Sequence, residues 1–90
     1  MPNKTKERWM NYSYVISSKV RTKIIKALEN KPLTPTQIAE KTDMNLSQVS
    51  HSLRDLTDEN LIECMNPKKK KGRLYTLLED GEWVLKKIEE

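Results

Sequence analysis

The sequence lacks the features of membrane, secreted and disulfide-linked proteins. It has a single cysteine, Cys64, so no disulfide can form within the chain, which fits a reducing, cytoplasmic location. Its apolar runs are only a few residues long, whereas a transmembrane helix needs roughly 20 residues. No apolar segment follows the basic N-terminus, so we expect neither a signal peptide nor a membrane partner.

Glycine and metal-binding side chains are also scarce. Gly72 and Gly81 are the two glycines, so the sequence has no glycine-rich phosphate loop. One histidine, His51, and one cysteine do not supply a zinc site. Spacing alone builds no serine–histidine–carboxylate set around His51. We therefore expect no enzymatic activity, no cofactor and no bound metal.

What is present is a small charged domain with one strongly basic segment. Ninety residues, 36% hydrophobic and 33% charged, are enough for a single core. The net charge is +4, from 17 basic and 13 acidic residues, and five of the positive charges lie in residues 66–73, which contain no acid. The rest of the chain therefore carries 12 basic and 13 acidic groups. Such a local positive field attracts polyanions.

The first 16 residues differ in character from the others. They begin polar and basic and then become aromatic, with Trp9, Tyr12 and Tyr14. Their hydrophobic periodicity is weak, so we expect a short helix or an extended arm over residues 1–16, a possible dimer contact. Residues 17–90 are expected to form the folded domain.

Helical spacing and capping signals predict three helices in the first part of this domain. Ser17 or Ser18 is placed to cap the first helix. Thr34 and Gln37 form a capping box around a proline at the first helical position. A second box begins at Asn45, only a few residues after the short middle helix ends, so these two helices must turn sharply against each other. The predicted helices span residues 17–29, 35–41 and 46–59.

The last third of the chain predicts a hairpin and a final helix. Two β-prone runs, residues 61–65 and 73–78, flank the lysine-rich segment, which ends in Gly72. A last helix is expected over about residues 79–90. The predicted fold is therefore mainly α with a small β-hairpin.

The helix over residues 46–59 has one apolar and one polar side. At 100° per residue, Val49, Leu53 and Leu56 form the buried stripe. Asp55 and Asp58 lie toward the C-terminal end of the polar side and would repel phosphates, so contacts are expected from the N-terminal half. The polar groups there, which can reach base edges or phosphates, belong to Ser47, Gln48, Ser50, His51 and Arg54. Any amphipathic helix has a polar face. The functional interpretation is favoured because a short capped helix precedes this one and a lysine-rich hairpin follows it.

The four consecutive lysines Lys68–Lys71 lie at the predicted hairpin tip, followed by Arg73. A tip of this kind can bind phosphates along a duplex or enter a minor groove, releasing counterions. The alternative is a solvated loop that protects a strand edge. Loops that serve solubility alone usually mix both signs of charge, which favours phosphate contact.

Trp83 lies away from the apolar side of the last helix. The aromatic residues Trp9, Tyr12 and Tyr14 have no core of their own to join. We therefore hypothesise that these three residues pack with Trp83, either within one chain or across a homodimer interface.

Several strings, in this order, resemble the ArsR/MarR-like transcription regulators of archaea and bacteria, in particular the archaeal type. The strings are residues 18–28, 33–39, 46–53 and 73–77, followed by Gly81. The resemblance covers about residues 17–88 and implies a winged helix-turn-helix. The sequence departs from the family pattern at Asn60, in place of a common glycine, and at Leu78, which leaves the last helix without a hydroxyl cap. Asparagine tolerates the left-handed conformation, so we expect the turn at Asn60 to survive.

The resemblance implies a transcription regulator that binds a specific site on double-stranded DNA, usually as a homodimer. The third helix would enter the major groove, and the hairpin wing would lie on the phosphate backbone or in the minor groove. The implied DNA contacts are Thr36, Ser47, Gln48, Ser50, His51, Arg54, Lys68, Lys69, Lys70, Lys71 and Arg73. The alternative is a winged-helix module that binds other proteins in a larger assembly, which the aromatic residues favour and the basic wing opposes.

Overall fold

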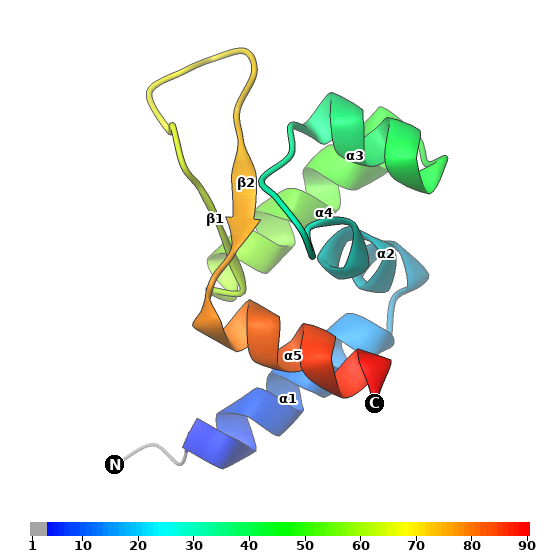
Figure 1. The fold of residues 1–90 in the computed structure, drawn as a ribbon, viewed down its shortest axis with the longest axis vertical. Helices are drawn as coiled ribbons and strands as arrows, with labels where there is room; N and C mark the ends of the chain where they lie inside the picture. Colours follow the sequence, from blue (N-terminus) through cyan, green and yellow to red (C-terminus); the bar gives the residue numbers. More distant parts are fainter. Residues whose placement is uncertain (1–3) are drawn as a thin grey trace.

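Within residues 4–90, which the computed structural model describes, the chain forms five helices and one two-stranded antiparallel hairpin (Figure 1). This confirms the predicted mainly α fold with a small hairpin. None of the helices in this range combines the length and apolar character needed to cross a bilayer. The elements are α1 (Lys4–Ile16), α2 (Lys19–Ala27), α3 (Pro35–Thr42), α4 (Leu46–Asp58), β1 (Ile62–Cys64), β2 (Tyr75–Leu77) and α5 (Glu79–Glu89).

Helix α1 occupies the region where the sequence predicted a short helix or an extended arm; the first three residues of that region lie outside the described part. The helix packs against α5, so segments from the two ends of the chain lie side by side (Figure 1). Val15, in its last turn, is fully buried. The backbone carbonyl of Val15 also accepts a hydrogen bond from the Thr22 hydroxyl of α2 at 3.1 Å. Helix α1 is therefore joined to the core.

The core lies among the five helices and the hairpin. Val49, Leu53 and Leu56 are buried on one side of α4, which confirms the predicted stripe. Removing such aliphatic side chains from water stabilises the fold by about 1.5–3 kcal/mol each. The other large side chains that are fully buried are Val15, Ile24, Ile25, Ile38, Leu61, Ile62 and Val84.

Local hydrogen bonds produce the sharp turn between α3 and α4. The Thr34 hydroxyl accepts from the backbone N–H of Gln37 at 3.2 Å, and the Gln37 side chain accepts from the Thr34 N–H at 2.9 Å. The predicted first capping box is thus confirmed. The second takes another form, because the Asn45 side chain accepts from the N–H of Ser47 at 2.7 Å, one residue earlier than in a box. Asp43, in the left-handed conformation with φ of 55°, ends α3.

The hairpin is held against the helix-turn-helix by a pairing that the sequence analysis did not predict. Strands β1 and β2 pair with Ile62 opposite Leu77. Just before α3, the Leu33 N–H donates to the Tyr75 carbonyl at 3.1 Å, and the Tyr75 N–H donates to the Leu33 carbonyl at 2.9 Å. These two bonds fix the direction of the wing relative to α3 and α4.

Both departures from the family pattern have the expected local structure. Asn60 adopts the left-handed conformation, with φ of 61°, between α4 and β1. Leu78 provides no side-chain cap for α5. Its N–H donates instead to the Leu61 carbonyl at 3.0 Å, and three acidic residues in the first turn complement the helix dipole.

Candidate nucleic-acid interface

The polar side of α4 faces solvent along its N-terminal half. This side is opposite the buried Val49 and Leu53, and the turn after α3 leaves it uncovered. Its hydroxyl, amide, imidazole and guanidinium groups all belong to residues that the sequence analysis selected. The exposed members are Ser47, Gln48, Ser50, His51 and Arg54.

His51 has a neighbour that the sequence analysis did not pair with it. Its Nε2 lies 3.7 Å from Oδ2 of Asp55, one turn further along α4. This distance is beyond that of a hydrogen bond, and the imidazole stays exposed.

The loop between β1 and β2 carries the exposed lysines Lys68–Lys71 and the exposed Arg73. Asn66 bridges the two ends of this loop: its Oδ1 accepts from the Leu74 N–H at 2.8 Å, and its Nδ2 donates to the Gly72 carbonyl at 3.1 Å. Asn66 was not selected from the sequence, where the turn dipeptide of residues 66–67 was the available signal.

Arg73, which the sequence analysis selected as a phosphate contact, also forms bonds within the loop. Its Nε donates to the Lys69 carbonyl at 2.7 Å, and one terminal nitrogen donates to the Pro67 carbonyl at 3.2 Å. A guanidinium group has five N–H donors. Donors thus remain for a phosphate after these two bonds have formed.

The wing and the helix-turn-helix meet across two adjoining hollows. Figure 1 shows the wing loop extending to the end of the molecule where α3 lies. One hollow is lined by Thr36, Ser50, Lys70, Lys71 and Arg73, among others. The second shares Ser50 and Arg73 and adds Arg54 and Asp58. Among the described residues, the remaining predicted contacts are exposed but line neither hollow: Ser47, Gln48, His51, Lys68 and Lys69.

Three of the four predicted aromatic residues meet between α1 and α5. The Trp9 ring packs edge to face on Trp83, at 5.2 Å between centroids, and on Tyr12, at 5.6 Å. Tyr14 lies apart from them, and its ring packs against the Arg21 guanidinium, whose Cζ is 3.8 Å from the ring centroid. Partial burial raises the pKa of the Tyr14 hydroxyl, and the Arg21 charge opposes this rise. The aromatic group thus forms within one chain, without Tyr14.

Three apolar side chains of α1 remain uncovered. Trp9 is 48% exposed, Met10 62% and Ile16 49%. Trp9 and Ile16 are seven residues apart, about two helical turns, so they lie on the same side of the helix, whereas Met10 points about 100° away from Trp9. Exposed apolar side chains that share one side of a helix can form an interaction surface. Sequence reasoning did not select Met10 or Ile16.

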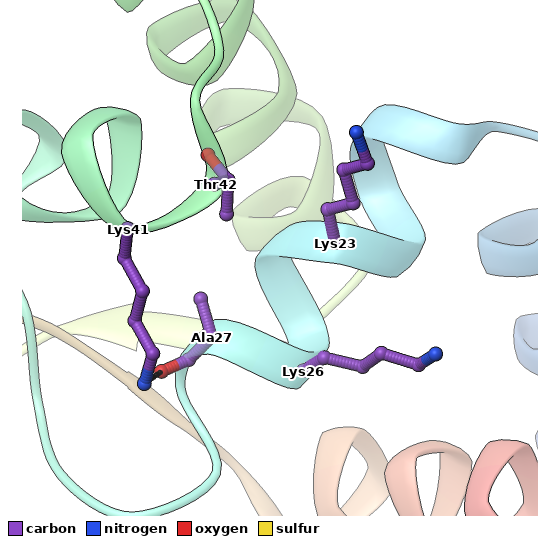
Figure 2. A pocket seen from close by; sticks show the side chains of 5 residues that line it. All are labelled: Lys23, Lys26, Ala27, Lys41 and Thr42. Atoms are coloured by element: carbon purple, nitrogen blue, oxygen red, sulfur yellow. Dashed lines mark hydrogen bonds between the residues drawn. The ribbon is translucent and has the colours of Figure 1, made fainter.

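A second basic group lies at the junction of α2 and α3, at the C-terminal end of α3. Lys41 Nζ donates to the Ala27 carbonyl at 3.1 Å and so satisfies a backbone acceptor at the end of α2. Figure 2 shows that the amino groups of Lys23, Lys26 and Lys41 point in different directions. These lysines therefore do not converge on a single anion.

Acidic and cysteine side chains gather at no metal-type site in the described range. Within residues 4–90, no three His, Cys, Asp or Glu side chains form a group that could hold a metal ion. Half-buried Cys64 donates from its Sγ to Asn66 Oδ1 at 3.5 Å.

The pKa of the Glu89 carboxyl is raised above its ordinary value. Desolvation is the largest cause and the nearby Glu29 carboxylate the next, whereas the positive charge of Lys26 opposes the rise.

The helix-turn-helix also defines the family. Residues 18–63, from the N-cap of α2 into β1, match the family described as bacterial regulatory protein, arsR family. The chain belongs to the arsR family. Regulatory proteins of this family are not enzymes, in agreement with the expectation from the sequence. None of the curated proteins compared with the sequence matches it.

Solved structures show that this arsR-family chain has the winged helix-turn-helix fold. One is the homodimeric DNA-binding domain of Mb0332 from Mycobacterium bovis, a possible ArsR-family regulator. It is 20% identical, and the match covers 94% of this chain and 78% of that chain with a TM-score of 0.74. HlyU from Vibrio cholerae is 19% identical, and the match covers 98% of this chain and 91% of HlyU with a TM-score of 0.75.

Lactococcus lactis ZitR, solved in complex with DNA, is 25% identical, with 74% of this chain and 47% of that chain covered and a TM-score of 0.67. The chain thus spans about half the length of ZitR. The archaeal type expected from the sequence stays a prediction.

Proposed function

We propose that the chain is a transcription regulator that binds a specific site on double-stranded DNA. The observation that supports this best is the pair of adjoining hollows between α4 and the wing. Ser50 of α4 and Arg73 of the wing line both, Lys70 and Lys71 line one, and Arg54 lines the other. A polar helix and a cationic loop that face the same space can contact one duplex together. A cytoplasmic location belongs to the same proposal.

In this proposal the N-terminal half of α4 enters the major groove. Gln48 and Arg54 carry amide and guanidinium groups that pair with base edges. Thr36 and the N-terminal end of α3 lie beside the wing, where a helix N-terminus favours a phosphate. Lys68–Lys71 and Arg73 would bind the flanking backbone or the minor groove. Asp55 and Asp58 keep the C-terminal half of α4 away from phosphates.

Sequence preference should depend on the exposed side chains of α4. Gln48→Ala and Arg54→Ala are each expected to cost about 1–3 kcal/mol of discrimination at one base pair, because a base-edge contact is lost. Competition titrations with single-base-pair variants of the selected site measure this loss. Asn30→Ala, at an exposed position after α2, should leave the preference unchanged. Equal weakening on every sequence would show that Gln48 and Arg54 contact phosphates only.

We further propose a homodimer formed through the α1–α5 side of the molecule. The interface would include Trp9, Tyr12, Tyr14 and Trp83. The uncovered apolar side of α1 supports this, as does the homodimeric state of the Mb0332 domain. Two recognition helices would then read half-sites about one helical turn apart.

The dimer is tested by placing charge on the uncovered side of α1. Ile16→Glu is expected to convert the dimer into a monomer, since a two-fold interface would then desolvate two carboxylates, one from each chain, which is unfavourable. Sedimentation equilibrium measures the mass. Asn30→Glu, a charge added elsewhere on the surface, should leave the dimer intact. An Ile16→Glu variant that keeps the mass of a dimer would exclude this side of α1 from the interface.

The decisive experiment for function is selection of bound sequences from a random duplex pool, with mass measurement of the complex. We expect one enriched sequence with two half-sites and two chains bound. The competing function is a winged-helix module for protein partners, which the exposed Trp9, Met10 and Ile16 favour. Such a module would show little retention of random duplex in a gel shift at low salt, and retention would argue against it.

A further inference from the structure

The wing loop closes on itself through hydrogen bonds of two of its side chains, Asn66 and Arg73. We propose that Asn66 and Arg73 are positioning residues, which hold residues 67–72 in the conformation that presents the wing lysines to phosphates. This inference rests on the proposed function. It gives Arg73 a role beyond direct phosphate contact and assigns one to Asn66 for the first time.

Asn66 acts as a clip across the base of the loop. Its side chain is half-buried and reaches the opposite end of the loop twice, accepting from the Leu74 N–H and donating to the Gly72 carbonyl. The same Oδ1 accepts from Cys64 Sγ. Both hydrogen-bonding ends of the amide are thus used. Gly72, with φ of 68°, adopts the left-handed conformation that brings its carbonyl to Asn66.

Arg73 stabilises the same loop through hydrogen bonds to its backbone. Its guanidinium donates to the carbonyls of Lys69 and Pro67, so a cation and not a carboxylate orders the lysine segment. The loop is therefore held without losing positive charge. Four adjacent ammonium groups repel one another, and an unbraced loop would have to be ordered at the moment of binding.

The two positioning residues predict how duplex affinity and its salt dependence should change in their variants. Asn66→Ala and Arg73→Lys are each expected to weaken duplex binding by about fivefold to tenfold, since each removes hydrogen bonds but no charge. The salt dependence of binding should stay that of the unaltered chain, because the lysines still release the same counterions in the complex. Met65→Ala, at an exposed position beside Asn66, is the control and should bind normally.

Two further readouts separate positioning from general destabilisation. Amide hydrogen exchange of Leu74 should quicken in Asn66→Ala, because this N–H loses its acceptor. In a chain with Lys68–Lys71 all replaced by alanine, Asn66→Ala should cause no further loss of affinity. The inference would be overturned if Asn66→Ala quickened exchange but left duplex affinity unchanged. It would also be overturned if Asn66→Ala lowered the affinity of the chain without the four lysines as much as that of the unaltered chain. Failure of the unaltered chain to bind any duplex would instead overturn the proposed function.

Discussion

Replacing Lys68–Lys71 with alanine is expected to lower duplex affinity by about three orders of magnitude per wing at roughly 0.1 M salt. All four lysines are exposed at the loop that faces α3 and α4. If each binds one phosphate, the slope of log affinity against log salt concentration should become shallower by up to about 3–4 units per wing. Binding titrations at several salt concentrations measure both quantities.

The control removes the same charge from another surface. Lys19, Lys23, Lys26 and Lys31 are exposed on α2 and just beyond it. Alanine at these four positions lowers the net charge equally, so any long-range attraction changes by a similar amount. We expect the salt slope to remain close to that of the unaltered chain. Equal slopes for the two fourfold variants would show a diffuse field in place of phosphate contacts by the wing.

Features that depend on neighbouring residues in the chain were predictable from the sequence. The Thr34–Gln37 box lies within four residues, and the buried stripe of α4 follows from helical periodicity. The left-handed turn at Asn60 follows from one residue type. The exposed face of α4 was predictable for the same reason: once the stripe is placed, the opposite side is defined.

Features that join distant segments were not predictable in this way. The Leu33–Tyr75 pairing connects residues more than 40 positions apart, so no local pattern records it. The Trp9–Trp83 contact was hypothesised only because these aromatic residues had no other core to join, and its geometry came from the packing of α1 on α5. The hydrogen bonds of Asn66 also depend on the length and path of the loop it spans. Periodicity places a residue on a face, whereas these contacts depend on how complete elements pack.

The close approach of α5 to the turn before β1 allows the second large effect to be predicted. Gly81 is buried in the first turn of α5, and a β-carbon added there would collide with the carbonyl oxygen of Leu61. That carbonyl already accepts the hydrogen bond from the Leu78 N–H which anchors the start of α5. The oxygen therefore cannot move away without loss of this bond. Glycine is required here by space, not by backbone conformation.

Gly81→Ala is accordingly expected to destabilise the fold by about 1–3 kcal/mol, near the upper end because backbone must shift. In a domain of this size the melting temperature should fall by roughly 10–20 °C. Alanine is the better helix former by about 1 kcal/mol, so a measured loss understates the steric cost. Lys86→Ala, exposed on the same helix, should stay within about 0.5 kcal/mol of the unaltered chain. Equal thermal unfolding of the two variants would show that α5 does not rest on the Leu61 carbonyl.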